Sequence, residues 1–136
     1  KRQVLTGGGS VIAALSRDLR SYAEGIGGRE QMAIEAFSSA LEVIPRTLAE
    51  NAGLDPVNTI IDLRKAHSEG KSTHGVNVYK GGVVDMAKAK VYEPSRVVEQ
   101  AIQSASETAV MILRIDDVIS SKGAGPMPED FEGMDM

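Results

Sequence analysis

Apolar residues recur every three or four positions in four long stretches of this chain, which is the spacing of one face of an α-helix. These stretches predict helices over about 11–24, 29–52 and 95–120, and one that starts at Pro56 and ends near 67–70. In the first helix the apolar face consists of Val11, Ala14, Leu15, Leu19 and Tyr22. The pattern therefore favours a mainly α fold with about four to five helices.

Residues that favour helix ends mark several of the boundaries. Ser10 is expected to cap the first helix with its hydroxyl, and Asp55 followed by Pro56 is typical of a helix start. Gly53 suits the position just after a helix C-terminus. Pro45 has no backbone N–H, so we expect the second helix to kink or end there and to resume over 47–52.

Short extended segments are predicted between the helices. Residues 3–6 have the character of a strand, and residues 91–95 are expected to be extended because the residue before a proline avoids the helical region. Residues 75–79 and the beginning of 82–86 alternate apolar and polar side chains around a glycine-rich turn, which predicts a small β-hairpin. The second arm also fits a turn of helix.

Composition narrows the class of protein. The 136 residues suit one domain, with 42% hydrophobic residues and a net charge of −4, and a general nucleic-acid partner would need a basic face. Without cysteine, disulfides and thiolate metal sites are excluded. No apolar run has the length of a membrane helix, and no signal peptide is recognisable. Because the chain begins at Lys1 in a sequence that already reads as strand, we expect a segment to precede it.

Three consecutive glycines, Gly7 to Gly9, lie between the first strand and the first helix. Glycine accepts positive φ angles and lets the backbone approach another molecule, and the helix N-terminus that follows offers unpaired N–H groups. A glycine run at such a junction is either an ordinary turn or a ligand contact, and the run alone does not decide between them.

Asn77 and Glu93 each have a structural and a functional interpretation. Asn77 is either a turn residue or an amide that reads a base, and Glu93 either neutralises the N-terminus of the last helix or accepts hydrogen bonds from ligand hydroxyls. Together with the glycine run they describe a nucleoside pocket, with the glycines beside the sugar, Glu93 on its hydroxyls and the hairpin against the base.

Other candidate sites are weaker. Gly70-Lys71-Ser72 matches the end of a phosphate-binding P-loop, but position 65 is not the required glycine and the order of strand and helix is reversed. His67 and His74 lack a third ligand in a rigid frame, so we expect no metal site. Asp116 and Asp117 either pair with a basic residue nearby or contact another subunit.

Several longer segments resemble the C-terminal part of the group II chaperonins, the family of the archaeal thermosome and its relatives in the eukaryotic cytosol. The most specific is the run LEVIPRTLAENAGLD from Leu41 to Asp55. The others are Gly7–Gly9, YAEGI at 22–26, GREQ at 28–31, AF at 36–37, GVNV at 75–78, VYEP at 91–94, AIQSA at 101–105 and LRIDDVI at 113–119. The resemblance extends from about residue 4 to residue 122, and the Gly- and Met-containing end looks like a thermosome tail.

The resemblance implies what the chain does. Residues 1–122 would form the C-terminal half of an equatorial domain, which binds ATP and makes most ring contacts, and residues 123–136 would form a flexible Gly/Met/acidic tail. The whole subunit would be a cytoplasmic, ATP-hydrolysing chaperone that folds non-native proteins in a double ring. Its cofactor would be ATP or ADP, its partners would be other chaperonin subunits and client proteins, and neither nucleic acid nor a membrane would be a partner.

Site residues are implied in the same way. Gly8 and Gly9 would lie against the ribose, Glu93 would accept from its hydroxyls, and Asn77, Val78 and Val91 would border the adenine. The family's phosphate loop, Gly-Asp-Gly-Thr-Thr, the aspartate that activates the attacking water and the apical domain are not in this sequence. We therefore assign no catalytic residue and no Mg²⁺ ligand here, and expect the chain alone to be inactive as an ATPase. A non-catalytic helical scaffold, with the glycine run as a mere turn, is the alternative.

Overall fold

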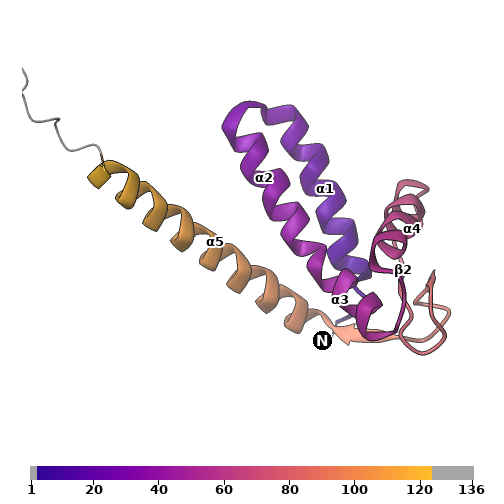
Figure 1. Ribbon diagram of the computed structural model, residues 1–136. Coiled ribbons are helices and arrows are strands. Elements are labelled where there is room, and N and C mark those ends of the chain that lie inside the picture. The colour runs from indigo at the N-terminus through magenta and orange to yellow at the C-terminus, as the bar shows by residue number, and fades with distance from the viewer. Residues whose placement is uncertain (1–2, 124–136) are drawn as a thin grey trace, which may run out of the picture. The chain divides into compact units, whose positions relative to one another are not determined.

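The computed structural model describes residues 3–123, and the chain divides into two compact units, residues 1–99 and 100–136. The elements, in chain order, are β1 Val4–Thr6, α1 Ser10–Ile26, α2 Gly28–Leu41, α3 Val43–Asn51, α4 Pro56–Ser68, β2 His74–Val76, β3 Val83–Asp85, β4 Tyr92–Pro94 and α5 Ser95–Gly123 (Figure 1). Helices prevail among the described residues, which confirms the prediction of a mainly α fold.

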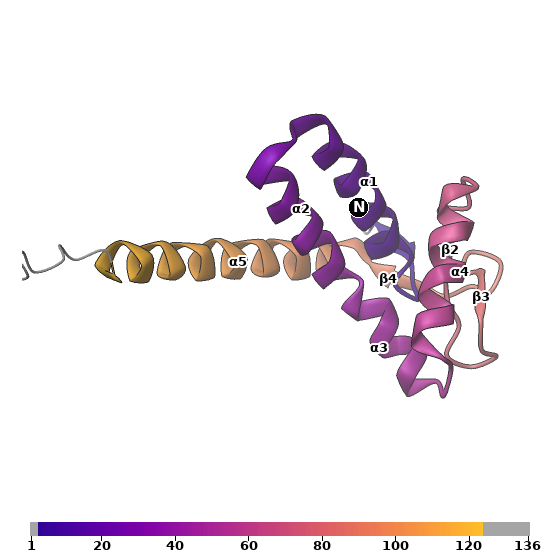
Figure 2. The ribbon, with the colours of Figure 1, turned by 45° about the horizontal axis from the view of Figure 1, so that its top comes forward.

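The first unit contains α1 to α4 and all four strands, together with the first turn of α5. Helices α1 and α2 lie side by side as an antiparallel pair, with α3 and α4 following α2 along the chain (Figures 1 and 2). A small apolar core joins α3, α4 and β2 through Ala49, Leu63 and Val76. This core fixes the hairpin that starts at β2 against two helices.

The strands form two separate two-stranded antiparallel sheets. The sheet of β2 and β3 pairs His74 with Asp85, which confirms the predicted hairpin. The sheet of β1 and β4 pairs Leu5 with Glu93, and a hydrogen bond of 2.9 Å from Gly7 N to Val91 O continues it toward the glycines. The pairing of β1 with β4 was not predicted; it places Val91 beside Gly7 and Glu93 opposite Leu5, two residues before the glycine run.

The prediction that Ser10 caps α1 is wrong. The cap is Gly9, with φ 74°, and Ser10 is the first residue of the helix. The Ser10 hydroxyl instead donates to the Thr6 carbonyl at 2.8 Å and lies 2.6 Å from the Thr6 hydroxyl. Because glycine adopts positive φ without strain, the backbone can turn into the helix here without a side-chain cap, and the serine ties the helix start to β1.

The prediction that the second helix kinks or ends at Pro45 is also wrong. The interruption lies at Glu42, between α2 and α3, and Pro45 is inside the first turn of α3. The first N–H groups of a helix have no acceptor within it, so a proline there removes no hydrogen bond. The first backbone hydrogen bond of α3 is donated by Arg46 N, the residue after the proline, to Glu42 O at 3.1 Å.

Other boundary predictions are confirmed. The Asp55 carboxylate accepts from Asn58 N at 3.0 Å and caps α4, with Pro56 in its first turn, and Gly53 has φ 74° after α3. No helix among residues 3–123 combines the length and apolar character needed to cross a bilayer. The predicted tail lies, apart from Gly123, outside the described residues, and so do the side chains of Asp116 and Asp117.

Candidate functional site

The glycine run forms a tight corner that packs on β2. Gly8 has φ 66°, is half-buried, and its carbonyl accepts from Val76 N at 2.8 Å. A Cβ on Gly8 would lie 2.7 Å from Val76 O and 2.8 Å from Met86 Cε, so no larger residue fits. Gly9 is buried, and a Cβ there would lie 3.0 Å from Pro45 Cβ. A molecule approaching this corner would therefore meet chiefly Gly8.

Asn77 follows β2 and is buried at 5% exposure. Its side-chain Oδ1 accepts from Tyr79 N at 2.9 Å and from Lys80 N at 3.0 Å, which is the turn role considered from the sequence. Within residues 3–123 no partner is recorded for Asn77 Nδ2, and that nitrogen is not among the fully buried unpaired atoms. The amide group is thus available to an acceptor.

Asn77 and Val91 line one shared hollow of about 450 Å³, between the hairpin and the segment that leads to β4. Its wall is completed by Tyr79, Lys80, Val84, Asp85, Lys88 and Ala89. Val78, next to Asn77, is 40% exposed and is not part of the wall. Gly8, Gly9 and Glu93 are not part of it either. The structure thus joins two of the six sequence-derived residues in this hollow. Val78 and Glu93 lie close to these two along the chain, whereas Gly8 and Gly9 are distant in sequence and reach β2 through the hydrogen bond from Val76 N to Gly8 O.

Glu93 lies on β4 and is half-buried. Burial raises the pKa of its carboxyl, and no hydrogen bond or ion pair of this side chain is recorded within the described part of the chain. Side chains two residues apart on an extended segment point to the same face, so Glu93 lies on the face of Val91. A desolvated acceptor without a partner is well suited to hydroxyl donors.

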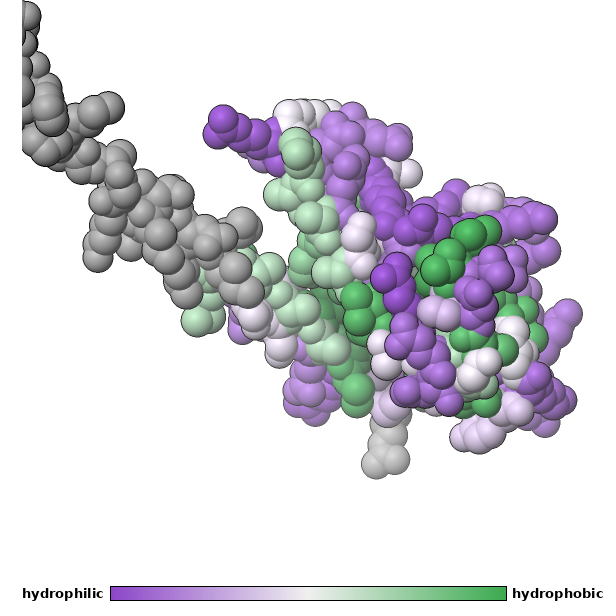
Figure 3. Space-filling view, viewed as in Figure 1, coloured by the Kyte–Doolittle hydropathy of each residue, from purple (hydrophilic) through white to green (hydrophobic). Residues whose placement is uncertain are grey.

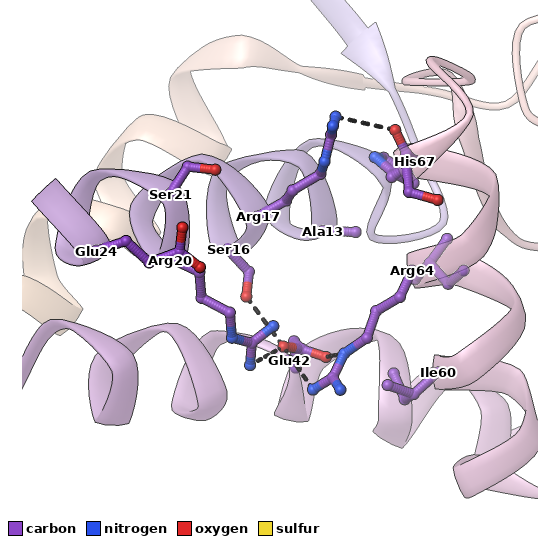
Figure 4. A pocket seen from close by; sticks show the side chains of 12 residues that line it. Ala13, Ser16, Arg17, Arg20, Ser21, Glu24, Glu42, Ile60, Arg64 and His67 are labelled. Atoms are coloured by element: carbon purple, nitrogen blue, oxygen red, sulfur yellow. Dashed lines mark hydrogen bonds and ion pairs between the residues drawn. The ribbon is translucent and has the colours of Figure 1, made fainter. Parts of the chain in front are cut away.

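A second hollow, of about 260 Å³, lies between α1 and α4 (Figure 4). At its base is Glu42, whose side chain is 5% exposed and forms an ion pair with Arg20. Arg64 donates to the same carboxylate from Nε at 2.8 Å and from Nη2 at 3.0 Å. The Ser16 hydroxyl also donates a hydrogen bond of 3.0 Å to the Glu42 carboxylate. One carboxylate between α2 and α3 therefore holds α1 and α4 together.

Acid is expected to weaken this cluster. Burial raises the pKa of the Glu42 carboxyl, but the hydrogen bond and charge of Arg64, with Arg20, outweigh it and bring the pKa below the ordinary 4.5. The unfolded state therefore binds the proton first, and the stabilisation is complete above pH 4.5 and is lost as the pH falls through the lower, folded value. Urea unfolding between pH 7 and pH 3 checks this, and the acid-dependent loss should be smaller in Glu42→Gln. An equal loss in both proteins would contradict it.

The two histidines do not form a metal site. His67 Nε2 lies 2.8 Å from the His74 carbonyl oxygen, which makes this a structural hydrogen bond from α4 to β2. Across the described residues no group of three or more His, Asp or Glu side chains could hold a metal ion. Sequence reasoning missed this contact and the Glu42 cluster. A signal existed for the second, because Glu42 is a lone carboxylate between Leu41 and Val43 in an apolar stretch.

Comparison with known proteins agrees with the fold. Residues 1–123 match the model of the TCP-1/cpn60 chaperonin family. The chain is 56% identical over 121 residues to thermosome subunit alpha of Archaeoglobus fulgidus, covering 89% of this chain and 22% of that protein. It is 57% identical over 116 residues to thermosome subunit beta of Thermoplasma acidophilum, covering 85% and 21%.

A solved structure agrees as well. The open-state monomer of a group II chaperonin from Methanococcoides burtonii superposes with a TM-score of 0.77 at 52% identity, covering 82% of this chain and 28% of that one. The chain belongs to the TCP-1/cpn60 chaperonin family. Its resemblance to group II chaperonins is thereby confirmed, and the relatives named above are thermosome subunits. The chain spans about a fifth of the length of those two curated relatives.

Proposed function

We propose that this chain is part of an ATP-dependent group II chaperonin subunit and supplies the ribose and adenine side of its nucleotide site. Residues 1–122 are then the C-terminal half of the equatorial domain. The whole subunit hydrolyses ATP, assembles with other subunits into stacked rings in the cytoplasm and folds non-native proteins. The single observation that carries the nucleoside site is that β1–β4 pairing and the Gly8–Val76 bond bring three distant segments together.

The residues fit a nucleoside in chemical terms. The Glu93 carboxylate has no recorded hydrogen-bond partner in the described part of the chain. Its two oxygens can therefore accept hydrogen bonds from the two ribose hydroxyls. Asn77 keeps its amide nitrogen for a base, and Val91 and Val78 offer apolar contact to a flat ring. Gly8 is half-buried, with no side chain of its own next to β2, and its backbone is where the sugar would lie. Gly9, buried against Pro45, shapes this corner from behind.

The triphosphate needs groups that this sequence does not carry. Bound Mg²⁺ would neutralise the phosphates and polarise the terminal one. The ribose and adenine contacts proposed here orient the nucleotide, and they neither activate water nor hold the metal. For this reason we propose that the chain alone does not hydrolyse ATP.

Exposed apolar side chains support the proposal of contacts with further protein. On α3, Val43 and Ile44 are 51% and 43% exposed, and on α4 Val57 and Ile61 are 64% and 55% exposed. Hydrophobic residues, green in Figure 3, reach the surface among polar ones on the face shown. Large apolar patches on a protein surface are typical of interfaces, here with the rest of the subunit or with neighbouring subunits.

Loss of the Glu93 carboxylate is the direct test. In the full-length subunit, Glu93→Gln should weaken ATP binding by roughly tenfold, because an amide offers one acceptor in place of two charged ones. Isothermal titration with ATP measures this, with the exposed Glu50→Gln as the matched control. Equal affinities in wild type and Glu93→Gln would favour the scaffold alternative, in which the glycine run only turns the chain.

A further inference from the structure

His67 is a buried residue, 3% exposed, that makes contacts in two directions from the C-terminal turn of α4. Its ring Nε2 lies 2.8 Å from the carbonyl oxygen of His74, the first residue of β2. Since a carbonyl only accepts, Nε2 carries the proton in this bond. Its own carbonyl accepts from Arg17 Nη1 at 3.0 Å, as Figure 4 shows. His67 thus connects α1 to β2 through α4.

These contacts close a circuit around the proposed nucleoside corner. Arg17 belongs to α1, the helix that begins at the glycine corner, and His74 opens the strand that leads to Asn77. Two residues after His74, Val76 N donates to Gly8 O at 2.8 Å. The circuit therefore runs from the glycines through α1, Arg17, His67 and β2 back to the glycines. Only one of its links, the bond from His67 Nε2, is a side-chain contact to the hairpin strand itself.

We propose that His67 is a positioning residue for the nucleotide site: its bond to His74 holds β2 at the depth where Asn77 and Val78 meet the adenine opposite Gly8. This inference rests on the proposed function and goes beyond it, because His67 itself does not line the hollow of Asn77 and Val91. A buried donor that fixes a strand holds the binding geometry before the ligand arrives, so the ligand loses less free energy in ordering the site.

The test separates nucleoside binding from phosphate binding in the full-length subunit. The ratio of the dissociation constants of tripolyphosphate and ATP measures what the ribose and base contribute. His67→Leu removes the donor at similar size, and this ratio should fall about fivefold to tenfold. His67→Gln carries an amide N–H at nearly the position of Nε2 and should restore most of the ratio. His67→Asn, whose amide is too short to reach His74 O, should behave like His67→Leu and replaces it if that variant does not assemble.

A purely structural role would give a different result. Ile60→Val trims a buried residue of the same helix, 4% exposed, and should lower the melting temperature while leaving the ratio unchanged. Equal ratios in wild type, His67→Leu and His67→Asn would overturn the inference while leaving the proposed function standing. If wild-type protein binds tripolyphosphate as tightly as ATP, the proposed nucleoside site and this inference both fail.

Discussion

Replacing Glu42 with alanine is expected to lower the free energy of unfolding by about 3 kcal/mol. The substitution leaves Arg20 and Arg64 without their shared carboxylate and the Ser16 hydroxyl without one of its acceptors. We expect the lower end of the range for buried ion pairs because the Arg64 side chain is 56% exposed and can turn to water. Urea unfolding of the chain, followed by circular dichroism, measures the change.

Two controls make the result specific to the cluster. Glu50→Ala removes an exposed carboxylate from α3 and should change stability by less than about 0.5 kcal/mol. Arg20→Ala combined with Glu42→Ala should cost less than the sum of the single losses, since the two residues share one interaction. Strict additivity, or a midpoint for Glu42→Ala equal to that of wild type, would show that the cluster does not hold the helices.

Gly8→Ala is expected to have a comparable effect on stability and a larger one on the proposed site. An alanine there adopts positive φ at a cost of about 1–2 kcal/mol, and its Cβ also meets the Val76 carbonyl oxygen at 2.7 Å. Since that neighbour is backbone, the corner and β2 have to separate. We expect about 3 kcal/mol of lost stability in total and a marked loss of ATP binding in the full-length subunit.

Gly28 provides the matched control for this change. It has φ 65°, nearly that of Gly8, but a Cβ there meets nothing within 4 Å. Gly28→Ala therefore carries only the backbone strain, and the difference between the two variants measures the contact of the corner with β2. If both variants lose the same stability and bind ATP equally, the close packing of Gly8 has no consequence and the corner is an ordinary turn.

The sequence predicted the helices and strands better than the tertiary contacts between them. Periodicity located the helices and the hairpin, and Asp55-Pro56 located a helix start, because these signals are local. The break was predicted at Pro45, because proline is a clear local signal, but it lies at Glu42. A proline ring crowds the carbonyl of the residue four positions earlier, here Leu41, so the break falls before the proline itself. The contact of Glu42 with Arg20 and Arg64 was missed as well, because a lone carboxylate in an apolar stretch indicates a buried ion pair without naming its partners.

The same limit applies to the candidate site. The glycine run, Asn77 and Glu93 were selected as chemically suitable residues, but nothing in their spacing showed that β4 would pair with β1. Sequence also left the two roles of Asn77 open, and the turn role is the one the structure records. His67 was weighed as a metal ligand, whereas its ring reaches a backbone carbonyl that has no signature in the sequence.

The antiparallel contact between β1 and β4 has a consequence for biosynthesis. Its two strands are the first and the last elements of the first unit before α5, so a ribosome must release nearly the whole unit before they can meet. Closing so long a loop is entropically costly, and contacts of this kind form late. The helices can form while translation continues, whereas the sheet of β1 and β4 forms afterwards. A nascent chain stalled before Tyr92 would thus possess its helical hairpin and lack the sheet of β1 and β4.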